Sequence, residues 1–331
     1  MKTVLITGAT GFIGREVSTY LSKKFPGWQI YCLQRPADPP LEQSGRNILK
    51  KLTVKPISLD LTEKKKFKKL PKVFDFIIHL AASAETSEKD HSFNPVAMKN
   101  ILDHIDSKQV KHFIFTSTTA VWSGRDNFTK GINEEMDPLP SNEYGRSKIM
   151  AENLLFNWSR IHQVPVTVLR LSTVFGHQTR SNGLFDALKK LIPKHSLIPR
   201  LNWPGKTSLV YVQDVVLLIS LLLKNKPKKL HNLYIVYSES LTMAGISRLM
   251  HQAMQVSYQA ITIPDGFWKM AGYISRYFYI LEFLPGNVYN FFWRSTLIIN
   301  PTLECHTKKL RNDFPGWKPV NFRQKVNEVC S

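Results

Sequence analysis

The chain has 331 residues, 43% of them hydrophobic, and a formal net charge of +20 at pH 7. A chain of this length buries enough apolar surface to fold without cross-links. Its three cysteines, Cys32, Cys305 and Cys330, are widely spaced, so we expect no disulfide framework, no metal site and a reducing, cytoplasmic location. A strand pattern begins at Lys2, so no signal peptide is expected, and the apolar runs are shorter than the roughly 20 residues of a membrane-spanning helix.

The first half of the chain alternates short apolar or β-branched runs with helical patterns. The expected strands are Lys2–Thr7, Gln29–Leu33, Val54–Leu59, Phe74–Ala81, His112–Ser117 and Val166–Leu171. The expected helices are Gly11–Lys24, a lysine-rich helix before Phe74, Pro95–Ser107 and Ser141–His162. Strands that alternate with helices of this length are joined by crossovers and lie parallel. The pattern predicts an α/β fold with a doubly wound parallel sheet of the Rossmann type in residues 1–176.

The alternation becomes irregular beyond Gly176. Residues 177–331 are expected to form a smaller, mostly helical substrate lobe. Strands near 209–212 and 232–236 are expected to return from this lobe to the main sheet.

Much of the positive charge lies in one short region before the expected fourth strand. Its lysines are Lys50, Lys51, Lys55, Lys64, Lys65, Lys66, Lys68, Lys69 and Lys72. The favoured interpretation is a solvated helix face, and the alternative is attraction to an anionic membrane surface or a phosphorylated substrate. No nucleic acid is expected as a partner, because aromatic residues that could stack on bases are not interleaved with these lysines.

The sequence TGATGFIG places Gly8, Gly11 and Gly14 between the first strand and the first helix. Such glycines allow a tight turn and a close approach of the backbone to a pyrophosphate, whose charge is met by the helix N-terminus. Because the motif follows a strand and opens a helix, it predicts a dinucleotide-binding site.

The residues after the second strand bear on the choice of dinucleotide. An NAD site usually has an acidic residue here for the ribose hydroxyls, whereas an NADP site has a cation. This chain has no acid in that place and has Arg35, while Arg15 follows the third glycine and could reach the same 2′-phosphate. The sequence favours NADP and leaves NAD open, the alternative being that both arginines are surface charges.

Tyr144 and Lys148 are four residues apart, which puts both side chains on one helix face. A nearby ammonium lowers the pKa of a tyrosine phenol toward the range useful for proton transfer. Tyr20 and Lys24 have the same spacing, but only Tyr144 lies between the fifth and sixth expected strands. The context therefore favours Tyr144 and Lys148 as a catalytic pair.

With these motifs the chain resembles the extended short-chain dehydrogenase/reductase family, also called the NAD-dependent epimerase/dehydratase superfamily. The resemblance runs from Lys2 to about Gln213 and is nearer the branch that contains hydroxysteroid dehydrogenases and dihydroflavonol reductases. It rests on motifs that follow one another in the family's order. They are TGATGFIG, Asp60-Leu61, HLAAS at His79–Ser83, Asn94, the segment Ser117–Trp122, the Tyr144–Lys148 pair, Arg170–Gly176 and Val210–Val215.

The resemblance implies roles for individual residues. Thr118, with Ser117 as the fallback, would bind the substrate carbonyl or alcohol, Tyr144 would transfer the proton, and Lys148 would assist the tyrosine and position the cofactor. It gives Asn94 a structural role and implies a homodimer through the helix that bears Tyr144. The cofactor-binding residues implied are Gly8, Thr10, Gly11, Phe12, Ile13, Gly14, Arg15, Arg35, Asp60, Leu61, Leu80, Ala81, Ala82, Tyr144 and Lys148.

Three functions stay open, in order of preference. The first is an NADP-dependent oxidoreductase that reduces a carbonyl, or oxidises the alcohol, of a hydrophobic small molecule. The second is a nucleotide-sugar epimerase or dehydratase with a tightly held cofactor, which Thr173 disfavours because such relatives usually carry asparagine there. The third is a cofactor-binding subunit without catalytic activity.

Aromatic residues are dense between Phe267 and Trp293. Part of this segment has helical spacing and is apolar on most of its surface. Such a helix is either buried in the lobe or lies against lipid. The favoured interpretation is burial, and the alternative is an apolar entrance for a hydrophobic substrate with peripheral membrane contact.

Overall fold

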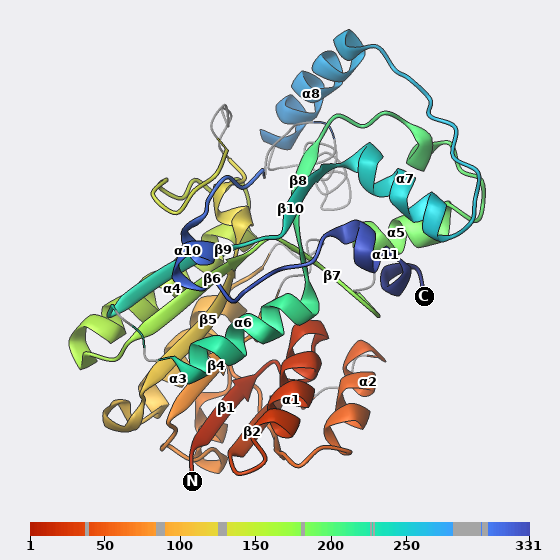
Figure 1. Ribbon diagram of the computed structural model, residues 1–331. Coiled ribbons are helices and arrows are strands. Elements are labelled where there is room, and N and C mark those ends of the chain that lie inside the picture. Colours follow the sequence, from red (N-terminus) through yellow and green to blue (C-terminus); the bar gives the residue numbers. More distant parts are fainter. Residues whose placement is uncertain are drawn as a thin grey trace.

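The computed structural model of the protein describes residues 1–36, 40–83, 90–124, 131–179, 183–225, 227, 229–280, 299 and 304–331. Figure 1 shows a twisted sheet with helices on both of its faces, below a smaller C-terminal part. In the described part of the chain, no helix is long and apolar enough to cross a membrane.

The main sheet has seven parallel strands in the order β3-β2-β1-β4-β5-β6-β9. Their bounds are β1 Thr3–Thr7, β2 Gln29–Gln34, β3 Lys55–Ser58, β4 Phe76–His79, β5 His112–Thr118, β6 Val166–Leu171 and β9 His231–Val236. The order reverses between β1 and β4, which creates a switch point at the carboxyl edge of the sheet. The predicted α/β fold with a doubly wound parallel sheet is confirmed.

Two layers of helices cover the sheet. One apolar core lies between the sheet and helices α1 (Phe12–Lys24) and α6 (Val212–Lys224), and a second lies between the sheet and helices α3 (Phe93–His104) and α4 (Glu143–His162). Side chains alternate along a strand, so Val4 and Ile6 enter the first core while Leu5 enters the second. This burial on both faces explains the continuous apolar runs of the strands.

Three strands that follow β6 in the chain form a second sheet, in the order β10-β8-β7. It contains β7 (Thr173–Phe175), β8 (Lys206–Tyr211) and β10 (Glu239–Thr242). Strand β9 returns to the main sheet as predicted. The prediction that the strand near 209–212 also returns to the main sheet was wrong, because this strand, β8, belongs to the second sheet. Because β9 occupies the edge of β6, β8 pairs instead with β7 and, in antiparallel fashion, with β10.

The C-terminal part carries several helices, and three of them form a third apolar core through Phe185, Ile246, Phe322 and their neighbours. The helices of this part are α5 (Leu184–Leu191), α7 (Met243–Ala253), α8 (Asp265–Ile280), α10 (Lys309–Asp313) and α11 (Phe322–Cys330), with the 3-10 helix η4 (Ile198–Arg200). Helix α8 lies at the end of the molecule farthest from the N-terminus (Figure 1). The part of the aromatic segment from Phe283 to Trp293 lies outside the described residues.

Two elements of the first half differ from expectation. Helix α2 (Pro40–Leu49) has no counterpart among the expected elements. The lysine-rich segment forms a 3-10 helix, η1 (Lys64–Lys69), in which Phe67 is buried and the five lysines are exposed. One apolar anchor among five lysines gives no amphipathic α-helical period, so a short turn of 3-10 helix suffices to bury it. The remaining 3-10 helices are η2 (Ser107–Gln109) and η3 (Thr119–Trp122).

Candidate active site

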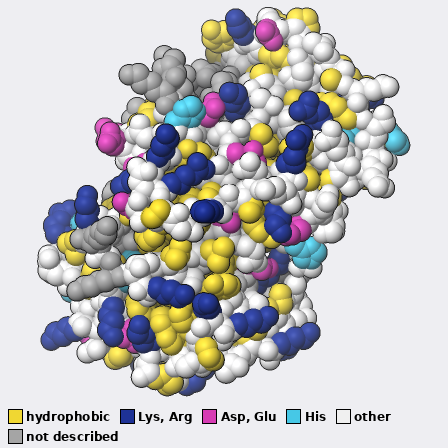
Figure 2. All heavy atoms as spheres, in the orientation of Figure 1, with side chains coloured by type: hydrophobic (Ala, Val, Ile, Leu, Met, Phe, Trp, Pro, Cys, Tyr) yellow, Lys and Arg dark blue, Asp and Glu magenta, His cyan; other side chains and the backbone are white. Residues whose placement is uncertain are grey.

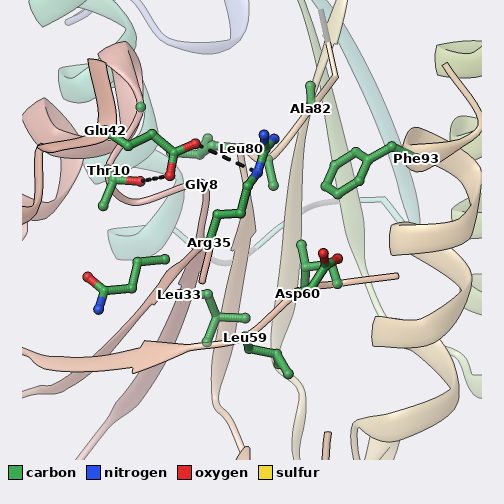
Figure 3. Close-up of a pocket in the computed structure, with 14 residues that line it drawn as sticks. Gly8, Thr10, Leu33, Arg35, Glu42, Leu59, Asp60, Leu80, Ala82 and Phe93 are labelled. Atoms are coloured by element: carbon green, nitrogen blue, oxygen red, sulfur yellow. Dashed lines mark hydrogen bonds and ion pairs between the residues drawn. The ribbon is translucent and has the colours of Figure 1, made fainter. Parts of the chain in front are cut away.

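A cavity of about 130 Å³ opens at the carboxyl ends of β1, β2 and β4, where the strand order reverses (Figure 3). Nine of its lining residues are among those that the sequence assigned to the cofactor: Gly8, Thr10, Gly11, Arg35, Asp60, Leu61, Leu80, Ala81 and Ala82. Five others were not expected: Leu33, Gln34, Glu42, Leu59 and Phe93. The crevice at a switch point is where doubly wound folds bind their ligands.

Gly8 shows that the turn after β1 is shaped for close backbone approach. Its φ is +66°, and a Cβ at this position would lie 2.7 Å from the amide nitrogen of Ala81. Any other residue would therefore combine a left-handed backbone with a collision against the end of β4. Glycine at this position therefore lets the turn after β1 pack directly against the end of β4.

Thr7 connects the ends of β1 and β4 beneath this turn and was not predicted. Its hydroxyl oxygen accepts the amide protons of Leu80 and Ala81, each at 3.2 Å. It also lies 2.7 Å from Nδ1 of His79. Burial, helped by the charge of Lys148, lowers the pKa of His79 to about 3. The ring is therefore neutral, and since the threonine oxygen already accepts twice, its own proton is donated to Nδ1 of the histidine.

Arg35 lies in the cavity together with an acidic residue from helix α2. Its Nε is 3.7 Å from Oε1 of Glu42, and the guanidinium lies 5.8 Å from the ring centre of Phe93. The hydroxyl of Thr10 donates to Oε2 of Glu42 at 3.3 Å. Figure 3 shows Arg35 and Glu42 turned toward one another across the cavity. The cation that the sequence assigned to a 2′-phosphate thus already has a carboxylate partner.

Asp60 follows β3 at the opposite side of the cavity. Its Oδ1 accepts hydrogen bonds from the amide of Thr62 at 2.8 Å and from the Thr62 hydroxyl at 2.7 Å. Partial burial raises the pKa of Asp60, but the bonds from Thr62 and the charges of Arg35 and Lys66 outweigh it and hold the pKa below the ordinary value. The site therefore offers an ionised carboxylate beside the carboxyl ends of β2 and β3.

Arg15 was expected to reach the same phosphate as Arg35, yet the structure places it elsewhere. It is buried, and its Nη2 donates to the carbonyl oxygens of His177 and Gln178 at 3.0 and 2.9 Å. It ties helix α1 to the segment after β7, and it does not line the cavity. Five further residues that the sequence assigned to the cofactor, Phe12, Ile13, Gly14, Tyr144 and Lys148, are likewise outside the lining residues.

Lys148 is buried behind the carboxyl end of β5. Its Nζ donates to the carbonyl oxygen of Thr116 at 2.7 Å and lies 4.2 Å from the ring centre of Phe115. Burial lowers the pKa of this amine to about 7, although the charge of Glu152 opposes the shift. Lys148 is not among the residues that line the cavity. The bond to Thr116 holds its amine in one place, and a pKa near 7 means that the amine gains or loses its charge near neutral pH.

Helix α4, which begins just before Tyr144, packs on the 3-10 helix η3, which begins just after Thr118. At Gly145 a Cβ would lie 2.9 Å from the carbonyl oxygen of Ala120, so the first turn of α4 sits directly against the backbone that follows Thr118. The ring of Tyr144 contacts that of His91, with 5.5 Å between centres. Thr118 accepts the amide proton of Ala120 at 3.1 Å, which leaves its own proton to donate.

Asn94 has the structural position that the family resemblance implies. Its Nδ2 donates to the carbonyl oxygen of Ser83 at 3.0 Å and to the hydroxyl of Ser147 at 2.9 Å, while its Oδ1 accepts from the amide of Ser83 at 3.0 Å. These bonds tie helix α3 to the segment after β4 and to helix α4. They fix the helix that carries Tyr144 and Lys148 relative to the sheet.

Ser117, the fallback for Thr118, has a buried hydroxyl without a hydrogen-bond partner among the described residues. Trp122 is also buried, with its indole donating to the carbonyl oxygen of Met136 at 3.0 Å. Its ring lies 4.5 Å from the guanidinium of Arg170, which forms a buried ion pair with Glu152 at 2.6 Å. Trp122 therefore belongs to the support of the site.

A glycine turn on a doubly wound sheet, an acid after the third strand and a Tyr–Lys helix after the fifth define the extended short-chain dehydrogenase/reductase class. The model of the NAD dependent epimerase/dehydratase family matches residues 4–235. The chain belongs to this family.

Comparison with individual proteins agrees with that assignment. A dTDP-D-glucose 4,6-dehydratase of Dictyostelium discoideum is 24% identical over 243 residues, 68% of this chain and 56% of the relative. An Escherichia coli N-acetyl-alpha-D-glucosaminyl-diphospho-ditrans,octacis-undecaprenol 4-epimerase is 25% identical over 86% of this chain and 82% of its own length. A Dictyostelium sterol-4-alpha-carboxylate 3-dehydrogenase is 26% identical over 56% of each chain. The chain thus spans little more than half the length of some relatives.

A solved structure shares the fold along almost the whole chain. UDP-glucuronic acid 4-epimerase from Bacillus cereus, in complex with UDP-glucuronic acid and NAD, superposes with a TM-score of 0.75 at 18% identity. The superposition covers 99% of this chain and 98% of that one.

Proposed function

We propose that this protein is an epimerase or dehydratase that acts on a sugar carried on a diphosphate, with a nicotinamide dinucleotide held at the carboxyl edge of the main sheet. The observation that carries the proposal is the cavity between the glycine turn and Asp60 at the carboxyl edge of the main sheet, together with Thr118 at the end of β5 and the Tyr144–Lys148 helix that packs behind it. The names of the dehydratase and 4-epimerase relatives refer to sugars carried on a diphosphate. This similarity supports an epimerase or dehydratase more strongly than it supports a reductase of hydrophobic carbonyl compounds.

Each of the three residues has a task in oxidising and re-reducing a sugar carbon. Tyr144 takes the proton of the sugar hydroxyl as the carbon is oxidised and returns a proton to the oxygen afterwards. Thr118 donates its hydroxyl proton to that same oxygen. The hydroxyl oxygen of Thr118 accepts the amide proton of Ala120, so the hydroxyl proton stays available for the substrate. Lys148, held on the carbonyl of Thr116, supplies the positive charge that favours the phenolate of Tyr144. The bound dinucleotide supplies a reversible acceptor for the hydride.

Both NADP and NAD stay compatible with the cavity. Arg35 supports NADP, whereas Glu42 beside it supports NAD, since a carboxylate repels a 2′-phosphate. Retention of the cofactor through each reaction cycle is the expected behaviour of an epimerase or dehydratase, because the hydride taken from the substrate is returned to it and the cofactor ends the cycle oxidised.

The second candidate function is an NAD(P)-dependent dehydrogenase or reductase of a hydrophobic substrate, the function that the sequence favoured. The similarity to a sterol-4-alpha-carboxylate 3-dehydrogenase supports it. So does Thr173, whose hydroxyl lies 3.2 Å from that of Thr207 at the position where nucleotide-sugar relatives usually carry asparagine.

The test begins with the purified protein, from which any bound nucleotide is released and identified. The emptied protein is then given NAD or NADP with UDP-glucose, UDP-glucuronate or dTDP-glucose, and the sugar products are separated by chromatography. Turnover of a sugar without net change in cofactor absorbance is expected. Net reduction or oxidation of the cofactor with a hydrophobic ketone or alcohol, and none with the sugars, would replace the proposal by the second candidate.

A matched pair of variants shows whether the helix α4 tyrosine does the chemistry. Tyr144→Phe removes the phenol and should lower turnover by about a thousandfold or more while cofactor binding is kept. Tyr20→Phe removes a phenol at the same spacing from a lysine, in helix α1, and should leave turnover within about twofold. Full turnover or full biological activity in Tyr144→Phe would contradict both enzymatic functions.

A further inference from the structure

Helix α8 presents an apolar face to solvent. Five of the fourteen exposed large apolar side chains among the described residues belong to this one helix: Phe267, Met270, Tyr273, Ile274 and Tyr277. Their exposed fractions range from 46% for Ile274 to 75% for Tyr273. At about 100° per residue all five lie on the same side of the helix. Apolar residues exposed singly are ordinary, whereas a cluster of this kind marks a surface for contact.

The opposite side of the helix is fixed to the protein. Trp268 is 5% exposed, packs on Trp203 with 4.7 Å between ring centres, and donates its indole proton to Oδ1 of Asn202 at 3.2 Å. The amides of Phe267 and Trp268 donate to the carbonyl oxygen of Pro264, which starts the helix. Anchoring through Trp268 therefore turns the apolar face away from the molecule, at its outer end (Figure 1).

The charge of the protein decides which partner suits this face. With a net charge of +20, two copies of the chain repel one another, whereas an anionic lipid surface attracts the whole molecule. Figure 2 shows Lys and Arg side chains spread over the visible face of the molecule, and hydrophobic side chains at the end where α8 lies. Lys269, on the flank of α8, is exposed beside the apolar face.

The composition of the face also suits a bilayer. Tyrosine has an apolar ring and a hydroxyl that stays hydrated, so it is enriched at the level of lipid headgroups. Helices that lie in the plane of a membrane bury such a face by about 5–10 Å and keep their cationic side chains at the headgroups. We propose that helix α8 docks this protein on an anionic lipid bilayer through the face formed by Phe267, Met270, Tyr273, Ile274 and Tyr277. The docking is reversible, and it does not depend on the reaction proposed above.

The test measures binding to vesicles and needs no enzymatic activity. The full-length protein is floated with vesicles of phosphatidylcholine alone or of phosphatidylcholine with about 30% phosphatidylglycerol, at low and at high salt. We expect binding to the anionic vesicles, little binding to the neutral ones, and weaker binding as salt screens the charge. Absence of binding to anionic vesicles, or equal binding to neutral ones, would overturn the proposal.

Two double variants separate the helix face from the general charge. Met270→Gln with Tyr273→Gln changes side chains that are 55% and 75% exposed on α8. Val73→Gln with Ile161→Gln changes side chains that are 52% and 76% exposed outside α8. The α8 variant should lose about tenfold or more of its vesicle binding, because two side chains no longer bury apolar area, while the control binds as the parent does.

Equal losses in both variants, or no loss in the α8 variant, would overturn the assignment to this helix. Light scattering of the parent in solution measures its oligomeric state. This measurement tests the alternative that the apolar face of α8 contacts a second copy of the chain. A dimer that the α8 variant converts to a monomer would show that the face joins two chains, and it would overturn the bilayer as the partner. Melting temperatures close to that of the parent establish that both variants are folded.

Discussion

Glu42 brings a carboxylate to the guanidinium that the sequence assigned to phosphate binding. Its distance of 3.7 Å from Arg35, and the hydrogen bond from Thr10, hold the negative charge in the cavity. A 2′-phosphate at Arg35 would be repelled by this charge, whereas ribose hydroxyls would not. Glu42→Gln should therefore raise affinity for NADPH relative to NADH by about fivefold, equivalent to about 1 kcal/mol for a partly exposed pair. Arg35→Ala should shift the ratio in the opposite direction.

The ratio of the two dissociation constants is measured by titration, with the fluorescence of the reduced nicotinamide as the signal. Glu63→Gln serves as the control, since it removes an exposed carboxylate that pairs with Lys66 and is not part of the cavity lining. An unchanged ratio in Glu42→Gln would show that the ion pair takes no part in the choice of cofactor.

Lys148 makes the stability of the protein depend on pH in a direction that can be calculated. Burial lowers the pKa of its amine from 10.5 to about 7, so the unfolded chain holds this proton more tightly than the folded chain does. The cost of the buried charge is full below about pH 7 and disappears as the pH rises toward 10.5. Relative to Lys148→Met, the parent should therefore gain about 1–3 kcal/mol of unfolding free energy between about pH 6 and pH 9. Urea unfolding of both proteins measures this difference, and parallel pH profiles would contradict it.

Helix α4 can position Tyr144 only because its first turn lies close to η3. At Gly145 a Cβ would approach the carbonyl oxygen of Ala120 to 2.9 Å and Cβ of Pro140 to 2.8 Å. Gly145→Ala should push the start of the helix away and lower turnover by about tenfold to a hundredfold, because small displacements of a catalytic group are costly. Gly27→Ala, where nothing lies within 4 Å of the added Cβ, is the matched control. If both variants kept full turnover, the close contact would have no role in placing the tyrosine.

Local sequence patterns were enough to predict those elements whose structure depends mainly on their own residues. The parallel strands of the main sheet were predicted because burial on both faces requires continuous apolar runs, and the turn at Gly8 because its backbone needs glycine. The partners of β8 could not be predicted, since they depend on which later strand pairs with the edge of β6. Nor could the positions of Arg15 and Glu42, because their partners at His177 and Arg35 come together only through tertiary packing.

The whole molecule has 45 lysine and arginine residues but only 25 aspartate and glutamate residues, so its positive charge is in large excess. Such an excess repels itself in the compact state, and dissolved salt reduces the repulsion. The exposed lysines of η1 contribute to this excess, including Lys65, Lys68 and Lys69. Three exposed lysines outside η1 contribute less to the repulsion, because each lies against a carboxylate. Lys99 contacts Asp103 at 2.8 Å, Lys111 contacts Asp75 at 2.6 Å and Lys190 contacts Asp186 at 2.8 Å.

The two sets of lysines should respond to salt in opposite ways. Raising the salt concentration from about 0.01 to 0.3 M shortens the screening length from about 30 Å to below 10 Å, so the melting temperature of the parent should rise by several degrees. Changing Lys65, Lys68 and Lys69 to glutamine should reduce this rise, because repulsion is already weaker at low salt. Changing Lys99, Lys111 and Lys190 to glutamine should leave the rise intact or increase it, since favourable ion pairs that salt weakens are lost. A melting temperature that falls with salt in the parent would mean that attractive pairs outweigh the net positive charge.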